Sequence, residues 1–260
     1  MKPWSVLIVL HIAILPGVSA RVGEWEVADR DFHAQVWQRT AQELDTVTGK
    51  TVQRHHRYVE LATGLNYQKD GQWLPTREEI ELLPTGFAVA RQGPHQVIFS
   101  PNANSIPATD LLSVDGKRFQ SRVLGIVCYD GATGASELIG ELKDSVGELL
   151  PPNRVVYRDA FDGVRASIRL TYTRAGLEQD IILHERPSLP PGFPPLTARL
   201  EVWTEFFDAP VPEQRRYVVR QQIGMPAVTD VQLNFGELRI GRGKAFALEN
   251  GQPEVPVFKD

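Results

Sequence analysis

Glycine-containing turn dipeptides recur along this chain, and they constrain its fold more than any other feature of the sequence. They are Thr48-Gly49, Asp70-Gly71, Thr85-Gly86, Asp115-Gly116, Asp130-Gly131, Asp162-Gly163 and Ala175-Gly176. Glycine adopts the positive φ of tight hairpin turns without strain, and aspartate tolerates it. The runs between these turns are short and rich in β-branched, aromatic and aliphatic residues, which favours strands. The pattern predicts a mainly β protein with hairpin connections, folded as an antiparallel β-sandwich or β-supersandwich.

The segment 33–62 is predicted to form one long hairpin around Thr48-Gly49-Lys50. An amphipathic helix beginning near Phe32 is the alternative, but threonine and valine flank the turn on both sides, which favours strands. Further runs with strand character are 58–62, 87–91, 95–99, 118–129, 136–142, 154–158, 198–207, 215–223, 230–235 and 237–240.

A second hairpin is predicted from Val164 to Glu185. With Ala175-Gly176 as the two-residue loop, the cross-strand pairs on the apolar face are Ile168 with Leu183, Leu170 with Ile181, and Tyr172 with Gln179. The acidic residues of the second strand then lie opposite threonines on the polar face. A slip by one residue would place Leu170 opposite Asp180, so burial of the apolar face is expected to fix the register.

The segment 187–195 is expected to be a stiff, extended loop. It contains five prolines, which lack the N–H donor that the interior of a strand requires. Residues 21–260 are predicted to form one β-rich domain in which this loop separates two layers, or two smaller domains that meet at this loop.

Residues 1–20 have the order of a secretory signal peptide. Met1-Lys2 gives a basic start, the run from Trp4 to Ile14 is almost entirely apolar, and Val18-Ser19-Ala20 ends it with small residues. A retained membrane anchor is the alternative, but the apolar run of roughly 15 residues is shorter than the about 20 residues of a spanning helix. The sequence therefore predicts cleavage after Ala20 and a secreted or cell-surface protein, without a membrane span after cleavage.

Charge and cysteine content exclude several classes of protein. The formal net charge is −4, whereas a nucleic-acid-binding protein needs a basic surface, so nucleic acid is not an expected partner. The single cysteine, Cys128, cannot form an internal disulfide, and an apolar core must therefore stabilise the exported fold. Cys128 lies in a strand-like run without a local activating base, which predicts a buried, unreactive thiol.

Two carboxylates on the second strand of the 164–185 hairpin are the candidate catalytic pair. Glu178 and Asp180 are two residues apart, so they share one face of the strand at a separation of roughly 6.5–7 Å. This separation overlaps that of the two carboxyl groups of an inverting glycosidase. The alternative is a solvated strand face, and a catalytic role would also require a cleft.

Asp159 and Asp162 are the candidate ligands for a metal ion. Both carboxylates lie close to the turn at Gly163, and calcium binds oxygen ligands of this kind. Their spacing lacks the alternating acids of an EF-hand loop, and an ordinary Asp-Gly turn is the alternative. His55 and His56 point to opposite faces of a strand and cannot bind one metal together. No cofactor is expected, because no cofactor-binding motif occurs in the chain.

Trp73 and Trp203 are the candidate ligand-binding residues. An exposed tryptophan offers a large flat surface to a sugar ring, whereas a buried one packs in the core. A cleft that joins either tryptophan to Glu178 and Asp180 would favour a carbohydrate-active enzyme. A convex polar surface around the two acids would favour a scaffold.

Six longer stretches of the sequence together carry a resemblance to a known family. They are Tyr58–Tyr67, Gly71-Gln72-Trp73, Ser121–Gly125, Asp159–Asp162, Thr171–Leu183 and Gly236–Phe246. Over roughly residues 55–250 the chain resembles the N-terminal region of large secreted or surface proteins of Verrucomicrobia- and Planctomycetes-type bacteria, some of which carry RHS/YD-type repeats further along. The resemblance implies no activity and transfers no catalytic residue. It implies that more protein follows, in agreement with Val255–Asp260, which reads as the beginning of another strand in a fragment of a longer reading frame.

The sequence therefore predicts an exported, non-catalytic structural or binding module, the N-terminal part of a larger cell-surface or secreted protein. Its expected partners are other domains of the same longer chain or cell-surface glycans. The alternative is a carbohydrate-binding domain, or a carbohydrate-active enzyme that uses strand-borne carboxylates.

Overall fold

A computed structural model describes residues 23–220, 228–247 and 255–259 of the protein. Every regular element in these ranges is a β-strand, and the sheets are antiparallel. The predicted mainly β fold is therefore confirmed. The described residues include no helix that is long and apolar enough to cross a membrane. The signal peptide predicted at 1–20 lies outside them.

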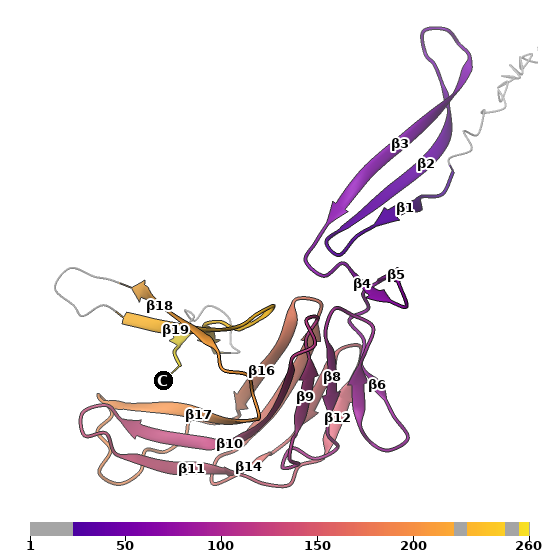
Figure 1. The fold of residues 1–260 in the computed structure, drawn as a ribbon. Helices are drawn as coiled ribbons and strands as arrows, with labels where there is room; N and C mark the ends of the chain where they lie inside the picture. The colour runs from indigo at the N-terminus through magenta and orange to yellow at the C-terminus, as the bar shows by residue number, and fades with distance from the viewer. Residues whose placement is uncertain (1–22, 221–227, 248–254, 260) are drawn as a thin grey trace, which may run out of the picture. The chain divides into compact units, whose positions relative to one another are not determined.

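The described chain divides into two compact units (Figure 1). The first unit comprises 23–30 and 34–61, and the second comprises 31–33 and the described residues from 62 onward.

The first unit is a three-stranded sheet. Its strands are β1 (Glu26–Arg30), β2 (Ala34–Leu44) and β3 (Thr51–Leu61). β2 and β3 pair over their full length, which confirms the hairpin predicted at 33–62. The turn between them is held by Asp45, whose Oδ1 accepts hydrogen bonds from the backbone N–H groups of Val47 and Thr48, both at 2.9 Å.

One face of this sheet carries an aromatic cluster. Trp25 meets Tyr58 edge-on with 4.8 Å between ring centroids, and Trp37 stacks on Tyr58 at 6.1 Å. The Arg39 guanidinium lies 4.7 Å from the centroid of the Trp25 ring, within the range of a cation–π contact. Ala41 is the only buried apolar side chain among the described residues of this unit. Cross-strand contacts at the surface therefore stabilise this sheet, without an enclosed core.

The second unit contains a sheet of eight strands. They are β6 (Glu81–Leu82), β7 (Ala88–Ala90), β8 (Gln96–Phe99), β9 (Thr109–Leu112), β10 (Arg118–Asp130), β11 (Ser136–Leu142), β14 (Phe161–Asp162) and β17 (Ala198–Phe207). Seven follow the order β14-β11-β10-β9-β8-β7-β6, and β17 pairs with β10. Five of them, β7, β8, β10, β11 and β17, begin and end within one residue of the predicted runs.

The long strand β10 joins two parts of this sheet. Along one edge it pairs with β17 from Gln120 to Asp130. Along the other edge its first residues pair with β9 and its last residues with β11. The ladder shifts register near the middle of β10, and such bulges bend a sheet. A Cβ at Gly125 would lie 2.6 Å from the Gly140 carbonyl oxygen, so this close approach requires glycine.

A four-stranded sheet faces the eight-stranded one. Its strands, in spatial order, are β12 (Gly147–Leu150), β13 (Arg154–Tyr157), β15 (Ala166–Thr173) and β16 (Gly176–Leu183). Buried side chains of both sheets form one hydrophobic cluster, with Val97, Phe99 and Ile126 from the larger sheet and Ile168 and Leu170 from the smaller. The two sheets thus form the predicted sandwich.

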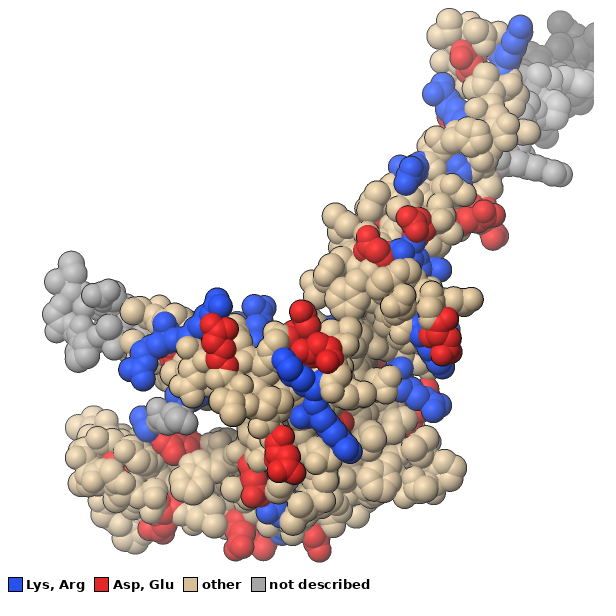
Figure 2. Space-filling view, viewed as in Figure 1, with Lys and Arg blue, Asp and Glu red and all other residues tan. Residues whose placement is uncertain are grey.

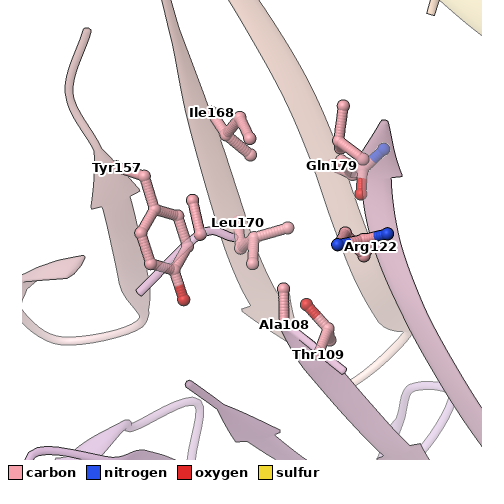
Figure 3. Close-up of a pocket in the computed structure, with 9 residues that line it drawn as sticks. Ala108, Thr109, Arg122, Tyr157, Ile168, Leu170 and Gln179 are labelled. Atoms are coloured by element: carbon pink, nitrogen blue, oxygen red, sulfur yellow. The ribbon is translucent and has the colours of Figure 1, made fainter. Parts of the chain in front are cut away.

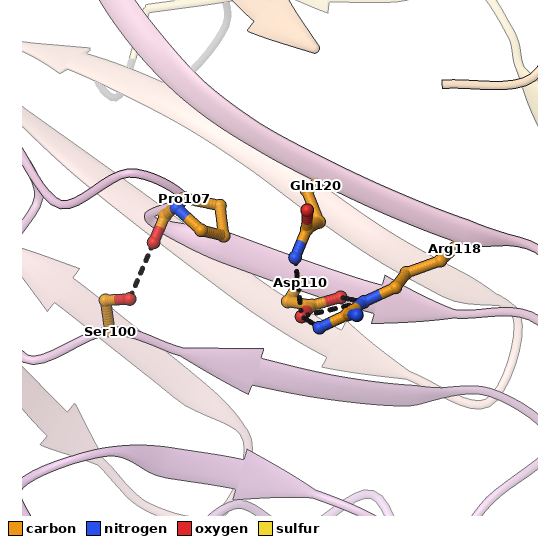
Figure 4. Close-up of polar contacts among 5 residues, drawn as sticks. All are labelled: Ser100, Pro107, Asp110, Arg118 and Gln120. Atoms are coloured by element: carbon orange, nitrogen blue, oxygen red, sulfur yellow. Dashed lines mark hydrogen bonds and ion pairs between the residues drawn. The ribbon is translucent and has the colours of Figure 1, made fainter. Parts of the chain in front are cut away.

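Two buried tyrosines cross this core and bind the two ends of β8. The Tyr157 hydroxyl donates a hydrogen bond to the Ser100 carbonyl oxygen at 2.7 Å. The Tyr172 hydroxyl donates to the His95 carbonyl oxygen at 2.9 Å. His95 and Ser100 flank β8, so the two hydroxyls fix this strand against the opposite sheet. Ser100 Oγ in turn donates to the Pro107 carbonyl oxygen at 2.8 Å (Figure 4).

The register predicted for the 164–185 hairpin is wrong by two residues. The observed pairs on the apolar face are Ile168 with Ile181, Leu170 with Gln179, and Tyr172 with Leu177. The loop is Arg174-Ala175 instead of Ala175-Gly176. A slip by two residues leaves every side chain on its predicted face, so burial alone does not distinguish the two registers. The observed register places Leu177, which packs on the core cluster, opposite Tyr172.

The proline-rich segment 187–195 connects the two facing sheets. It lies between β16 of the smaller sheet and β17 of the larger one, and no strand is described between Leu183 and Ala198. The prolines therefore lie where the chain crosses from one layer to the other.

A third sheet packs on the core cluster through Phe235. Its strands are β18 (Glu213–Arg220), β19 (Val228–Phe235) and β20 (Leu238–Ile240), close to the predicted runs 215–223, 230–235 and 237–240, of which 221–223 lie outside the described residues. The Phe235 ring meets Phe119 edge-on, with 4.8 Å between centroids. Lys117 Nζ donates to the Phe235 carbonyl oxygen at 2.7 Å.

The last described residues contact this third sheet through hydrogen bonds from Lys259 to Asp230. β22 (Val255–Val257), in the segment predicted to begin a strand, pairs with β21 (Gly243–Ala245). The buried Asp230 carboxylate accepts hydrogen bonds from Lys259 Nζ at 3.0 Å and from the Tyr217 hydroxyl at 2.9 Å. Burial alone would raise the pKa of Asp230, but the hydrogen bonds from Lys259 and Tyr217 outweigh it and lower the pKa.

Replacing Tyr157 by phenylalanine should lower the free energy of unfolding by about 1–3 kcal/mol, because the Ser100 carbonyl loses its buried donor. Urea denaturation followed by tryptophan fluorescence measures this change. Tyr129→Phe is the matched control, since the half-buried Tyr129 ring lies under Arg199 and its substitution should cost less than about 0.5 kcal/mol. Equal losses in the two variants would contradict the role given to the Tyr157 hydroxyl.

Candidate binding groove

Trp73 lies on a short hairpin of the second unit. β4 (Asn66–Lys69) and β5 (Gln72–Pro75) pair with Gln68 directly opposite Trp73. The turn between them is the predicted Asp70-Gly71, in which the two residues have φ of 52° and 77°. Two successive residues with positive φ are typical of a tight two-residue hairpin turn. This turn fixes the register that places Trp73 opposite Gln68.

An open groove with a volume of about 970 Å³ lies beside this hairpin. Its lining includes three aromatic residues, three glutamines, three charged residues, and small or apolar residues from the β7–β8 and β9–β10 connections. All of them belong to the second unit. The volume is at the upper end of the range of ligand pockets, about 300–1,000 Å³. The groove is therefore the candidate functional site.

The aromatic part of the groove consists of Phe32, Tyr67 and Trp73. Phe32 and Trp73 lie with their ring centroids 6.4 Å apart and their planes tilted by 50°. All three side chains are half-buried, so each is held by its neighbours and still contributes surface to the groove. Aromatic rings placed in this way offer flat apolar surfaces to a ligand.

The charged part of the groove is organised around Glu81 on β6. Its carboxylate accepts hydrogen bonds from Gln92 Nε2 at 2.9 Å and from Arg91 Nη2 at 2.6 Å. Both hydrogen bonds lower the pKa of Glu81, and the one from Gln92 contributes most. Glu81 is therefore ionised at neutral pH and has a cation beside it. Lys69 on β4 is the remaining charged residue of the lining.

The wall formed by Gly93, Pro94 and Gln96 adjoins a buried pair, His95 and Tyr172. A Cβ at Gly93 would lie 2.1 Å from the Tyr172 hydroxyl oxygen, so this position accepts only glycine. The rings of His95 and Tyr172 have centroids 4.9 Å apart, and His95 Nε2 has no hydrogen-bond partner among the described residues. Burial lowers the pKa of His95. The wall thus rests on a neutral, buried imidazole.

Two carboxylates, one on β9 and one in the β9–β10 connection, are already paired. Asp110 accepts hydrogen bonds from Arg118 and from Gln120 Nε2, the latter at 3.1 Å (Figure 4). The hydrogen bonds from Arg118 lower the pKa of Asp110. Asp115 lies 3.1 Å from Lys117 Nζ. Both aspartates are therefore neutralised by neighbours of opposite charge.

A second, much smaller cavity lies inside the sandwich between β10 and β16 (Figure 3). Its volume is about 10 Å³, which accommodates about one water molecule. Arg122 and Gln179 supply its polar lining together with Thr109. Arg122 Nη2 is 3.1 Å from Glu205, and Arg122 Nε has no partner among the described residues. This cavity is too small for a substrate.

The structure places Glu178 and Asp180 on the outward face of β16. Asp180 forms an ion pair with Arg169, whose Nη2 is 2.8 Å from the carboxylate. Glu178 is exposed. Neither carboxylate lines the groove or the small cavity, so the structure does not bring this pair together with Trp73 in either site.

The candidate metal ligands Asp159 and Asp162 share a lysine. Lys143 Nζ lies 3.0 Å from Asp159 and 3.4 Å from Asp162. An ammonium group thus bridges the two carboxylates. In the described part of the chain, no group of three or more His, Cys, Asp or Glu side chains is arranged to hold a metal ion.

Trp203, the second candidate ligand-binding residue, lies on β17 and outside the groove. Its side chain is 47% exposed, and its Nε1 donates a hydrogen bond to Glu201 at 3.0 Å. Cys128 on β10 is fully buried, and burial raises the pKa of its thiol, as expected for an unreactive cysteine.

Sequence reasoning identified Trp73 but missed most of the other lining residues. Phe32 and Arg91 come from segments far from Trp73 in the chain, and only the fold brings them to the groove. Tyr67 and Lys69 are different, because a local signal was present. They precede the predicted Asp70-Gly71 turn and Trp73 follows it, so a hairpin around that turn could have been expected, with Tyr67 and Lys69 on one face and Trp73 on the other.

Comparisons with known proteins do not assign the chain to a family. No protein-family model, no curated protein and no solved structure matches it. Any functional assignment therefore depends on the chemistry of the groove itself.

Acidification should destabilise the protein through His95. Because burial lowers its pKa in the folded state, the unfolded chain binds more protons once the pH falls below the ordinary value of 6.5. The free energy of unfolding should then decrease as the pH falls, by at most about 1.4 kcal/mol per pH unit. Urea denaturation at about pH 7.5 and about pH 5.5 measures the difference.

His95→Gln should remove this part of the pH dependence. His55→Gln is the control, since His55 is exposed on β3 and contacts Thr40 at 3.0 Å. The same pH dependence in the His95→Gln variant and in the unchanged protein would exclude His95 as its source.

Proposed function

We propose that this protein is an exported, non-catalytic binding module that holds a carbohydrate chain in the groove beside Trp73. The observation that carries this proposal is the combination of Phe32, Tyr67 and Trp73 with glutamine side chains around one groove. Aromatic rings bind the C–H faces of sugars, and amide groups both donate and accept hydrogen bonds with hydroxyls. Ligand sites in general combine apolar walls with a few placed polar groups.

The size of the groove favours an oligosaccharide over a single sugar. Its volume of about 970 Å³ is far above that needed for one monosaccharide. Aromatic residues from separate segments, Phe32 before β2 and Tyr67 and Trp73 on the β4–β5 hairpin, offer more than one contact surface. Several sugar units in a row would use these surfaces together.

The charges of the groove favour binding over hydrolysis. Most glycosidases place two carboxyl groups on either side of the scissile bond. Glu81 is the only carboxylate among the described residues of the lining, and Gln92 and Arg91 lower its pKa, which does not suit a proton donor. Glu178 and Asp180 lie outside the groove. A carbohydrate-active enzyme built on those two acids is therefore the less supported alternative.

Export and a place at the cell surface are part of the same proposal. Residues 1–20 have the order of a signal peptide. The resemblance to N-terminal regions of large secreted or surface proteins of Verrucomicrobia- and Planctomycetes-type bacteria supports this location. On this proposal the module is the N-terminal part of a larger surface protein. Its partners are cell-surface glycans and further domains of the same chain.

Trp73→Ala should weaken carbohydrate binding by at least about tenfold, because it removes an aromatic wall of the groove. A glycan array identifies the ligands of the unchanged protein, and isothermal titration calorimetry with the best of them measures the change. Trp203→Ala is the matched control, since it removes a half-exposed tryptophan outside the groove and should leave the affinity unchanged.

Urea denaturation of both variants keeps this test independent of folding, because loss of affinity counts only where the midpoint is retained. A protein that binds no glycan on the array would contradict the proposal. Loss of binding in Trp203→Ala alone would move the site to β17 and contradict it as well.

A further inference from the structure

We infer that the carbohydrate in the Trp73 groove is acidic, an oligosaccharide whose uronic-acid carboxylates contact Lys69 and Arg91. This inference rests on the proposed function and adds the chemical class of the ligand. Lys69 and Arg91 line the same groove as the aromatic residues. A bound carboxylate would therefore meet a cation while its sugar ring contacts an aromatic side chain.

The described lining of the groove carries one positive charge in excess. Lys69 and Arg91 are its cations, and Glu81 is its one carboxylate. Glu81 already accepts hydrogen bonds from Arg91 and Gln92. The Lys69 side chain has no hydrogen bond or ion pair with any described residue, and its cross-strand neighbour is the uncharged Gln72. The Lys69 ammonium is thus exposed and forms no ion pair with a described carboxylate, including the exposed Asp70 beside it in the turn.

The carboxylates of β9 and of the β9–β10 connection are paired with other cations and do not neutralise Lys69. Asp110 is bound by Arg118, and Asp115 lies 3.1 Å from Lys117. Over most of the visible surface, acidic and basic side chains are interspersed (Figure 2). A ligand would therefore be selected by the local imbalance at Lys69, and not by a long-range field of the whole protein.

The geometry of β4 places a cation and an aromatic ring at a distance that suits one acidic sugar. Tyr67 and Lys69 are two residues apart on the same strand, so they share one face at roughly 6.5–7 Å between Cα atoms. A sugar ring against Tyr67 leaves its carboxylate within reach of the ammonium group on the flexible Lys69 side chain.

Arg91 offers a second anion contact. Its Nη2 binds Glu81, whereas a guanidinium has five N–H donors in all. The remaining donors are suited to the planar, bidentate recognition of a carboxylate. Gln68 and Gln96 in the same lining supply uncharged partners for the hydroxyls.

A panel of paired oligosaccharides tests this inference. Each uronic-acid oligomer is printed beside the neutral oligomer obtained by reducing its carboxylates to primary alcohols, so the sugar rings and linkages are the same. The protein should bind the acidic member of at least one pair about tenfold more tightly or better. Added sodium chloride should reduce that preference, because salt screens exposed charges.

Lys69→Gln should weaken binding of the acidic member about tenfold and change binding of the neutral member by less than about twofold. Lys50→Gln is the matched control, because Lys50 is an exposed lysine at the β2–β3 turn of the first unit. It should alter neither affinity. An undiminished preference for the acidic member in Lys69→Gln would overturn the inference.

The remaining outcomes separate this inference from the proposed function. Equal or tighter binding of the neutral members, with loss of binding in Trp73→Ala, would overturn the acidic ligand and support a carbohydrate in the groove. Binding of no member of any pair would overturn both. Poly-glutamate that binds as tightly as the best acidic oligosaccharide would overturn the inference, because charge alone would then account for the affinity.

Discussion

Two hydroxyl groups that cross the sandwich core hold the architecture of the second unit together. Tyr157 and Tyr172 reach from the smaller sheet to the carbonyl groups at the two ends of β8. A buried carbonyl without a donor is costly, so ring packing and hydroxyl position must be satisfied together. This double requirement constrains how β8 packs against the smaller sheet. Because Tyr172 also lies against Gly93 and His95, the contact that closes the core also positions one wall of the groove.

The groove combines this fixed wall with elements that have little core of their own. Gly93 and Gln96 belong to a segment that the sandwich holds in place, whereas Trp73 and Lys69 lie on the two-stranded β4–β5 hairpin. Loops and short hairpins on a rigid scaffold commonly carry binding residues, because they tolerate changes that a core does not. On the proposed function, the side chains expected to select the ligand thus lie on a hairpin that contributes no residue to the core cluster.

Much of the fold was predictable from the sequence, and the reasons for the failures are physical. Turn dipeptides located the hairpins because positive φ at Asp70-Gly71 is a local property of the chain. The register of β15 and β16 was not predictable, because a two-residue slip preserves every face. For the site, Trp73 was identified as a single residue, but its assembly with Phe32 and Arg91 depends on tertiary contacts that no spacing encodes. In the same way, the lysine that bridges Asp159 and Asp162 comes from a distant segment.

The sparsely buried sheet of the first unit has a consequence for how the protein opens. Ala41 is its one buried apolar side chain among the described residues, whereas the sandwich encloses a continuous cluster. Segments with few buried contacts open at a lower free energy than the global unfolding of the molecule. We therefore expect the β1–β3 sheet to open as a separate cooperative unit, so that its amide hydrogens exchange with solvent while those of β8 and β10 stay protected. A protease should therefore cleave this sheet before it cleaves the sandwich, because proteolysis requires an opened chain.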